Sequence, residues 1–218
     1  MVRPEFAYVA ENLLLRGGYR KTHFQADAVT FYNVSNMGTR FEGVNEILHL
    51  QGTIFQPKIT FRRERVNLET FYFHELILQS LVKNKIKNEK LNIILEHFDV
   101  NIPSDYFEVL GEKALPEGFV DIFIKMKHPT GSNLFFPVEV KTGKAKLSEA
   151  EQLEAYMKEL GNECKGGVLI AKDFPKTLSQ YCESENILPI KYYFENLDDQ
   201  KEYTYEELLN LLKLEVVG

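Results

Sequence analysis

Two runs of β-forming residues separated by a polar turn constrain the fold of this chain most strongly. Residues 118–124 read G-F-V-D-I-F-I, and residues 135–141 read F-F-P-V-E-V-K. Between them, residues 129–133 read P-T-G-S-N, a composition typical of a loop. The pattern predicts a hairpin of two β-strands joined by a long loop.

Charged side chains interrupt these otherwise apolar strands. Because successive residues of a strand point to opposite faces, Glu139 and Lys141 share one face, while the valines beside them face the core. Asp121 lies inside the first strand, where a carboxylate without a partner is costly. If the strands pair, Asp121 comes beside Glu139, and two adjacent carboxylates raise each other's pKa unless a cation lies between them. This arrangement predicts a site for Mg²⁺, which prefers oxygen ligands.

The same residues also fit a simpler interpretation. Glu-x-Lys is a common sequence, and a surface Glu–Lys pair next to an exposed Asp is ordinary on an antiparallel hairpin. The sequence after the hairpin favours the metal site. A helix is predicted over residues 148–160, with Ser148 as its N-cap, Glu151 completing a capping box and Gly161 at its end. Residues 167–171, G-V-L-I-A, then predict a short buried strand.

A further helix is predicted before the hairpin. Asn67 is suited to its N-cap, and Phe71, Glu75, Leu78 and Val82 recur at helical spacing. Another short helix is predicted over residues 89–98. The order of helices, hairpin, helix and strand predicts an α/β fold with mixed strand directions.

The segment G-F-V-D, followed after 17 residues by E-V-K and then by a helix carrying Gln152 and Tyr156, resembles the core motif of the PD-(D/E)XK nuclease superfamily. The resemblance covers about residues 67–175. It implies a restriction-endonuclease-like core, in which a central mixed β-sheet is flanked by helices, with N-terminal and C-terminal elaborations. Val120 replaces the proline that names the motif, a replacement that is frequent in the superfamily.

Two branches of the superfamily are similar to this chain. The segments V-E-V-K-T-G and Q-L-E-A-Y resemble motifs of RecB-like nucleases, many of which hold an iron–sulfur cluster on four cysteines. This chain has two cysteines, Cys164 and Cys182, which we expect to be free thiols. In size and core the chain is also similar to Holliday-junction resolvases of archaea and their viruses, and a nuclease of an archaeal spindle-shaped virus is one specific possibility.

The resemblance implies a catalytic triad of Asp121, Glu139 and Lys141. The two carboxylates and the backbone carbonyl of Val140 are expected to hold Mg²⁺ or Mn²⁺, and Lys141 is expected to orient the attacking water.

Further residues near the triad are also implied. Glu75 occupies the first helix, where many members place an additional acid that reaches a second metal ion, and Glu69 is its rival. Gln152 is expected to position the lysine or a phosphate, and Tyr156 to pack beside it. Asp27 is not followed by a Glu-x-Lys at a suitable distance, so it is not interpreted as the motif aspartate.

Charge limits how the chain could bind nucleic acid. Its net charge of −6 argues against a protein that coats nucleic acid by bulk attraction. Local basic groups are candidates for contacts with DNA phosphates, although each also fits a solvated surface. These residues are Arg62, Arg63, Arg65, Lys144 and Lys146.

Length and hydropathy indicate an intracellular, cytoplasmic protein, located in the host cell if it is viral. No apolar run approaches the roughly 20 residues that span a bilayer, and the N-terminus lacks a signal-peptide pattern. We expect one elaborated domain with an N-terminal elaboration over residues 1–66 and a nuclease core over residues 67–175. A C-terminal extension over residues 176–218 would carry an amphipathic helix.

The residues and the resemblance together predict a metal-dependent nuclease that hydrolyses phosphodiester bonds in DNA. Structure-specific cleavage, as by Holliday-junction resolvases, is one option that the resemblance implies. Cleavage of two strands at a junction would favour a homodimer. Two alternatives stay open: a nuclease-like fold without activity that binds DNA or assembles with partners, and an endonuclease that acts on RNA.

Overall fold

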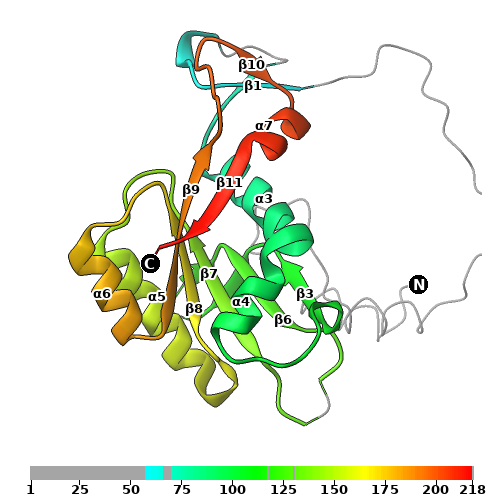
Figure 1. Ribbon diagram of the computed structural model, residues 1–218, viewed down its shortest axis with the longest axis vertical. Coiled ribbons are helices and arrows are strands. Elements are labelled where there is room, and N and C mark those ends of the chain that lie inside the picture. Colours follow the sequence, from blue (N-terminus) through cyan, green and yellow to red (C-terminus); the bar gives the residue numbers. More distant parts are fainter. Residues whose placement is uncertain (1–56, 66–69, 117, 130, 218) are drawn as a thin grey trace, which may run out of the picture.

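The computed structural model describes residues 57–65, 70–116, 118–129 and 131–217 (Figure 1). The sequence pattern also predicts a helix over residues 4–16 and short β-type runs over residues 25–61, but that helix and most of those runs lie outside the described residues. Asp27 and Glu69 lie outside them as well.

A six-stranded mixed sheet forms the centre of the fold, in the order β11-β9-β8-β7-β6-β3. The predicted hairpin is confirmed, because β6 and β7 pair antiparallel with Ile122 opposite Val138. Strands β7, β8 and β9 run parallel, whereas the edge strands β3 and β11 are antiparallel to their neighbours. The six strands are β3 (Phe107–Leu110), β6 (Ile122–Met126), β7 (Phe135–Val140), β8 (Gly167–Ala171), β9 (Ile187–Phe194) and β11 (Leu212–Val216).

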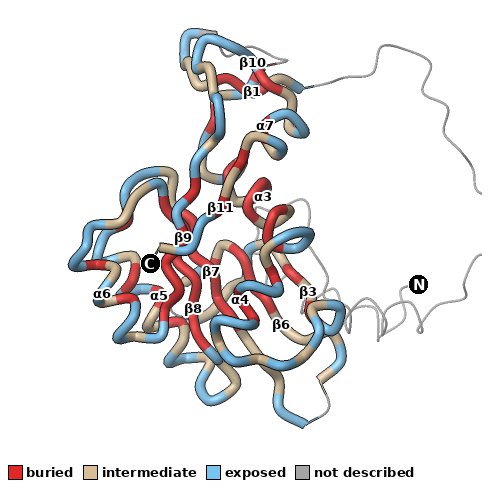
Figure 2. The backbone as a smooth tube through the Cα atoms, viewed as in Figure 1, coloured by how far each residue is buried: buried red, intermediate tan, exposed pale blue. Residues whose placement is uncertain are grey.

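Helices cover both faces of this sheet, and the buried residues form a core on each face (Figures 1 and 2). On one face, α3 and α4 pack against Val138 and Val140 of β7. On the other face, α5 and α6 pack against Phe123 and Leu169. The chain is therefore an α/β protein with a central mixed sheet flanked by helices, as expected for a restriction-endonuclease-like core. These helices are α3 (Glu75–Lys85), α4 (Leu91–His97), α5 (Leu147–Leu160) and α6 (Lys176–Ser184).

A smaller sheet of three strands, in the order β10-β1-β2, stands above the main sheet in Figure 1. We call it the upper sheet. It joins distant parts of the chain, because β1 pairs antiparallel with β10 through Ile59 and Tyr203 and parallel with β2. The chain rises to it through β9 and returns through α7 and β11. The remaining elements are β1 (Lys58–Thr60), β2 (Thr70–Tyr72), β10 (Glu202–Tyr203) and α7 (Tyr205–Leu211).

The main sheet continues well beyond residue 175. Residues 176–218 were expected as an extension, yet they supply β9 between β8 and β11, and β11 at the edge. The amphipathic helix expected in this segment is α7, and its Leu208 is fully buried in the core on the α3 face. The C-terminal segment is thus part of the central architecture.

The helix expected to begin at Asn67 begins later. Thr70–Tyr72 form β2, and α3 starts at Glu75 with His74 as its N-cap. The position of Phe71 fits the periodicity of a helix and that of a strand equally well. It lies in a strand because this segment pairs with β1. A π-helical segment, Ile86–Lys90, connects α3 to α4, which confirms the short helix expected over residues 89–98.

The helix after the hairpin is confirmed as α5, but it starts one residue early. Its N-cap is Lys146, not Ser148, and the backbone N–H of Lys146 donates to Glu149 Oε2 at 2.9 Å. Gly161, with φ of 66°, ends the helix as expected. The predicted strand over residues 167–171 is β8. Among the helices of the described residues, none combines the length and the apolar character needed to cross a membrane.

Candidate active site

Asp121 lies where the chain leaves one sheet and enters another. Before it, β5 (Gly118–Val120) pairs with β4 (Lys113–Leu115) in a two-stranded sheet, and directly after it β6 joins the main sheet. Asp121 Oδ2 accepts a hydrogen bond of 2.8 Å from the backbone N–H of Val140. Because Val140 follows Glu139 in β7, this bond fixes the Asp121 carboxylate beside the acid of the neighbouring strand.

Glu139 and Lys141 lie together at the end of β7. Glu139 is buried, with 2% of its surface exposed, and its Oε1 lies 2.7 Å from Lys141 Nζ. The valines on either side of Glu139 are in the core of the opposite face, as strand alternation requires. The structure thus brings Asp121, Glu139 and Lys141 together at one end of the β6–β7 hairpin.

One oxygen of this cluster has no hydrogen-bond partner within the part of the chain that the structure describes. Among the described residues, none donates a hydrogen bond to Glu139 Oε2, although that atom is buried. A buried carboxylate oxygen without a donor costs free energy, and such an atom in a folded protein calls for an explanation. A cation bound between Glu139 and Asp121 would supply the missing interaction.

The electrostatics of the cluster also favour a bound cation. Burial, opposed by the Val140 N–H and the charge of Lys141, raises the pKa of Asp121 to about 6. Burial and the nearby charge of Asp121 raise the pKa of Glu139 to about 7. Burial alone would lower the pKa of Lys141, but the hydrogen bond and charge of Glu139 outweigh it and raise that pKa. The lysine therefore stays charged, while both acids are unusually easy to protonate.

Glu75, at the start of α3, contacts the lysine directly. Its Oε1 lies 3.4 Å from Lys141 Nζ, and 40% of its side chain is exposed. Lys141 thus bridges Glu75 and Glu139. The second metal ion that Glu75 was expected to reach stays a prediction, because the contact the structure shows is with the lysine.

The site could hold Mg²⁺ only with help from other ligands. Within the described ranges, no three His, Cys, Asp or Glu side chains are gathered for a metal ion. Two carboxylates are compatible with Mg²⁺, which usually binds one or two of them and completes its octahedron with water and substrate phosphate. The donor set and the unpartnered Glu139 Oε2 therefore fit this ion.

Gln152 and Tyr156 are brought to the strand that leads to Asp121. The Gln152 amide donates to Tyr156 Oη, and Tyr156 Oη donates to the carbonyl of Phe119 at 3.3 Å. Tyr156 is fully buried, whereas Gln152 is exposed. This pair ties α5 to β5, so it positions Asp121. The contact shown for Gln152 is with the tyrosine, and its expected role of positioning Lys141 or a phosphate stays a prediction.

Gly118 allows this close approach of the tyrosine. Its φ is +147°, and a Cβ added there would lie 2.6 Å from Tyr156 Oη. Gly118→Ala is therefore expected to lower the free energy of unfolding by roughly 2 kcal/mol, through backbone strain and displacement of the tyrosine. Chemical denaturation measures the change. Gly143→Ala is the matched control, because a Cβ there meets nothing within 4 Å; an equal loss in both variants would contradict this role.

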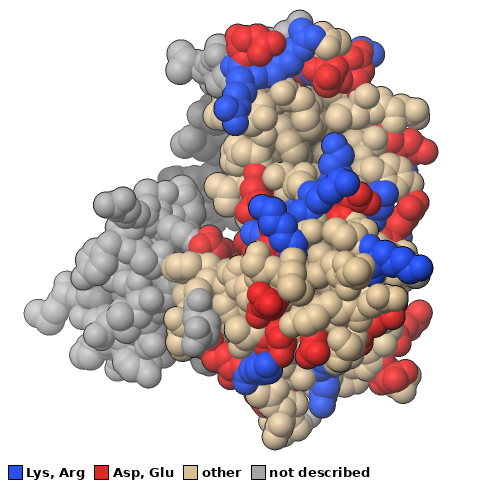
Figure 3. Space-filling model, turned by 90° about the vertical axis from the view of Figure 1, so that its left-hand side faces the viewer, with Lys and Arg blue, Asp and Glu red and all other residues tan. Residues whose placement is uncertain are grey.

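The candidate DNA-binding residues fall into two groups. Lys144 Nζ lies 3.3 Å from Asp173 Oδ2 in the segments that follow β7 and β8, and exposed Lys146 caps α5. Arg62 and Arg63 follow β1 in the upper sheet. The side chain of Arg65 lies outside what the structure describes. Figure 3 shows one face of the molecule, with blue groups on its upper part and across its middle.

Tyr192 also belongs to the site, although nothing in the sequence pattern singled it out. Its Oη donates to the carbonyl of Thr142 at 2.7 Å, which fixes the chain directly after Lys141. Burial raises the pKa of Tyr192 to about 12, with a further contribution from the charge of Glu75. Tyr192 comes from β9, so its contact with the site depends on the parallel sheet and could not be inferred from local spacing.

The chain shows only limited similarity to known proteins. No known protein family matches the chain, and no curated protein matches it. Two solved structures are similar to part of it. A complex of EndoMS with double-stranded DNA is 24% identical, with 46% of this chain and 43% of that chain covered and a TM-score of 0.31. A repair endonuclease from Pyrococcus abyssi is 21% identical, with coverages of 45% and 43% and a TM-score of 0.30. The similar region thus spans less than half the length of either protein.

The raised pKa of Glu139 predicts a pH dependence of stability in the absence of divalent ions. Because its folded-state pKa of about 7 exceeds the ordinary 4.5, the folded protein binds more protons than the unfolded chain between these values. The free energy of unfolding should therefore fall as the pH rises through this window and level off above it. We expect a loss of about 2 kcal/mol from Glu139 between pH 5 and pH 8.

Urea denaturation in EDTA at several pH values measures this loss. Glu139→Gln cannot ionise, so its stability should decline less over the same range, and it should be more stable than the wild type at pH 8. Parallel curves for the two proteins would contradict the burial of an ionised Glu139.

Proposed function

We propose that this protein is a metal-dependent nuclease that hydrolyses phosphodiester bonds in DNA. One observation carries the proposal. Two carboxylates with raised pKa values lie beside a charged lysine at the end of a hairpin. One of them has a buried oxygen to which none of the described residues donates a hydrogen bond. This is a poor arrangement for stability alone, and it is well suited to a divalent cation and a phosphate.

Asp121, Glu139 and the carbonyl of Val140 are proposed to hold Mg²⁺ or Mn²⁺. When bound, such an ion supplies Lewis-acid activation of water and charge neutralisation at the phosphate. The Val140 N–H holds the Asp121 carboxylate in place, and the Gln152–Tyr156 pair holds the strand that precedes it. The protein thereby fixes both acids before the substrate arrives.

Lys141 is proposed to orient the attacking water and to stabilise the charge that develops on the phosphate. An ammonium group has three N–H donors, and two of them are directed at Glu139 and Glu75. We assign the third to the water or to a phosphate oxygen. Because its pKa is raised, Lys141 acts as a hydrogen-bond donor and a charge, not as a base.

DNA is the proposed partner, and its phosphates are proposed to contact Arg62, Arg63, Lys144 and Lys146. Exposed Gln152 lies close enough to the strand of Asp121 to contact a phosphate of the same substrate. Action on a branched structure, and the homodimer that cutting two strands of a junction would favour, are part of the proposal.

The test is incubation of the protein with branched, flapped, nicked, single-stranded and fully paired DNAs and with RNA, each with Mg²⁺ or Mn²⁺. Cleavage of DNA that EDTA stops supports the proposal. Cleavage confined to RNA would replace it with an RNA endonuclease. Binding of DNA without any cleavage, by protein whose metal content has been verified, would leave a DNA-binding module.

A further inference from the structure

A pocket of about 590 Å³ lies directly beside the candidate active site. This volume is within the range of about 300–1,000 Å³ that is common for small-molecule sites. Its walls come from the upper sheet, from β9 and from the ends of β7 and β8. The residues that matter here are Arg63, Tyr72, Phe194, Lys172, Glu75 and Thr142.

Two contacts connect this pocket to the catalytic lysine. Glu75 lines the pocket and also lies 3.4 Å from Lys141 Nζ. Thr142, the residue after Lys141, lines the pocket too, and its carbonyl accepts the hydrogen bond from Tyr192 Oη. A ligand in the pocket therefore lies next to the position proposed for the scissile phosphate.

Aromatic rings make up much of the pocket wall. Phe61 and Phe73 are stacked with ring centroids 4.6 Å apart, and Phe194 meets both edge-on at 5.9 and 5.6 Å. Tyr72 is half-buried and carries the guanidinium of Arg63 at 5.1 Å from its ring centroid. Flat apolar rings of this kind are the surfaces on which proteins stack unpaired bases.

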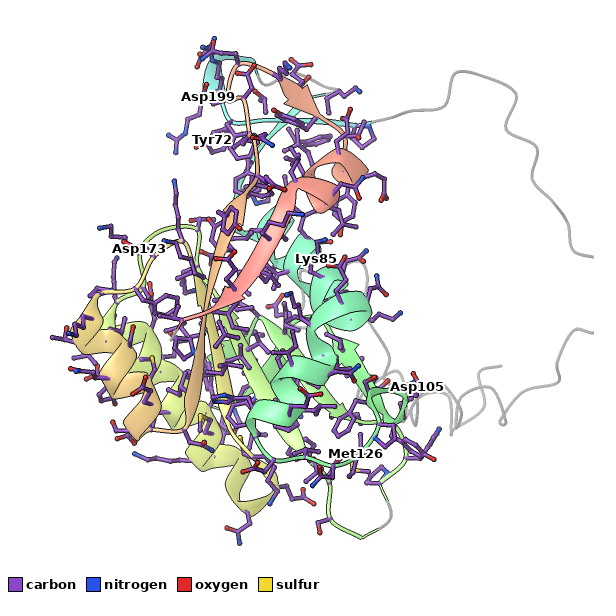
Figure 4. The ribbon with its side chains drawn as sticks, viewed as in Figure 1. Tyr72, Lys85, Asp105, Met126, Asp173 and Asp199 are labelled. Atoms are coloured by element: carbon purple, nitrogen blue, oxygen red, sulfur yellow. The ribbon has the colours of Figure 1, made fainter. Side chains whose placement is uncertain are left out.

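Basic side chains lie on two sides of these rings. Arg63 lies on the upper sheet, and exposed Lys172 follows β8 on the main sheet below. In Figure 4, Tyr72 lies on the upper sheet and Asp173, the neighbour of Lys172, lies in the loop beneath it. This arrangement is complementary to a nucleotide. The flat face of its base can stack on the aromatic rings, and its negative phosphates can pair with the two cations.

We propose that this pocket binds one unpaired nucleotide of the DNA substrate, with its base on the aromatic wall and its phosphates at Arg63 and Lys172. The inference rests on the proposed nuclease function and specifies its substrate. Bases inside an intact duplex are stacked on their neighbours and cannot enter a pocket without extrusion. The substrate class is therefore DNA that carries an unpaired base close to the cut.

The experiment compares a duplex containing one bulged 2-aminopurine with the same duplex in which that base is paired, in EDTA so that nothing is cut. The wild-type protein should bind the bulged duplex more tightly and quench its fluorescence by stacking. Tyr72→Ala should weaken binding of the bulged duplex roughly 5- to 50-fold and remove the quenching, with little effect on the paired duplex. Tyr72→Phe should retain both.

Matched controls are available on the same strands. Phe71 is the neighbour of Tyr72 on β2 but does not line the pocket, so Phe71→Ala should change neither signal. Lys172→Ala should lower the salt dependence of binding, whereas Lys165→Ala, before the start of β8, should not. Thermal unfolding of Tyr72→Ala confirms that the variant is folded.

The outcomes separate this inference from the nuclease proposal. Equal wild-type affinity for the two duplexes, or equal losses from Phe71→Ala and Tyr72→Ala, would overturn the pocket even if the protein cuts DNA. A preference for the bulged duplex that depends on Tyr72 would support the pocket even if no DNA is cut.

Discussion

Replacing Lys141 with alanine is expected to lower the rate of DNA cleavage at least about a hundredfold while changing DNA affinity by less than about threefold. The reason is that this side chain lies within a cluster of carboxylates, and its proposed role concerns the attacking water and the developing charge, not the grip on DNA. Single-turnover cleavage and a salt-titrated binding assay on the same DNA measure the two quantities.

Two further variants make this result interpretable. Lys141→Met keeps most of the side-chain volume and should lose activity equally, whereas Lys165→Ala should keep it. Replacing Arg62 and Arg63 together should do the reverse of Lys141→Ala, with weaker binding and a flatter salt dependence. Cleavage by Lys141→Ala within about threefold of the wild type would exclude the assigned role for the lysine.

Magnesium or manganese is expected to raise the melting temperature by roughly 5 °C at pH 8, because an ion that binds only the folded protein stabilises it. The reason for preferential binding is the pair of neighbouring acids, because Glu139 Oε2 is buried without a hydrogen-bond partner among the described residues and Asp121 lies beside it. Differential scanning fluorimetry with increasing metal concentration, starting from EDTA-treated protein, measures the shift.

Glu139→Gln should abolish most of this shift, and Glu183→Gln should preserve it. Glu183 is an exposed carboxylate on α6 and is not among the residues that contact Asp121, Glu139 or Lys141 in the described part of the chain, so it controls for the loss of a charge. Equal shifts in the wild type and Glu139→Gln would show that the ion binds elsewhere.

The hairpin that carries the site could be predicted because its signals are local. Alternation within β6 and β7 decides which side chains face the core, and a turn-forming loop separates the two strands. The same reasoning failed at Phe71, where one residue fits two periods, and at β9, whose sequence I-L-P-I-K-Y-Y-F was not assigned to the sheet. Pro189 interrupts that run, yet it is paired inside the parallel ladder opposite Leu169.

Contacts between distant elements account for what the sequence could not predict about the site. The pairing of Glu75 with Lys141 and the bond from Tyr192 to Thr142 depend on how α3 and β9 lie against β7. Helical and strand periodicities relate only residues that are close in sequence, so they cannot predict contacts between residues that lie this far apart along the chain. The proximity of Asp121 and Glu139, by contrast, could be predicted because one hairpin holds both.

The upper sheet has a consequence for the order in which the protein assembles. Its pairing of Ile59 with Tyr203 closes most of the chain into a loop, and it is held by only a few residues on each strand. Long loops close late in folding, and small sheets of this kind open at lower free energy than a central one. Amide hydrogens of β1 and β10 should therefore exchange with solvent sooner than those of β7 and β8.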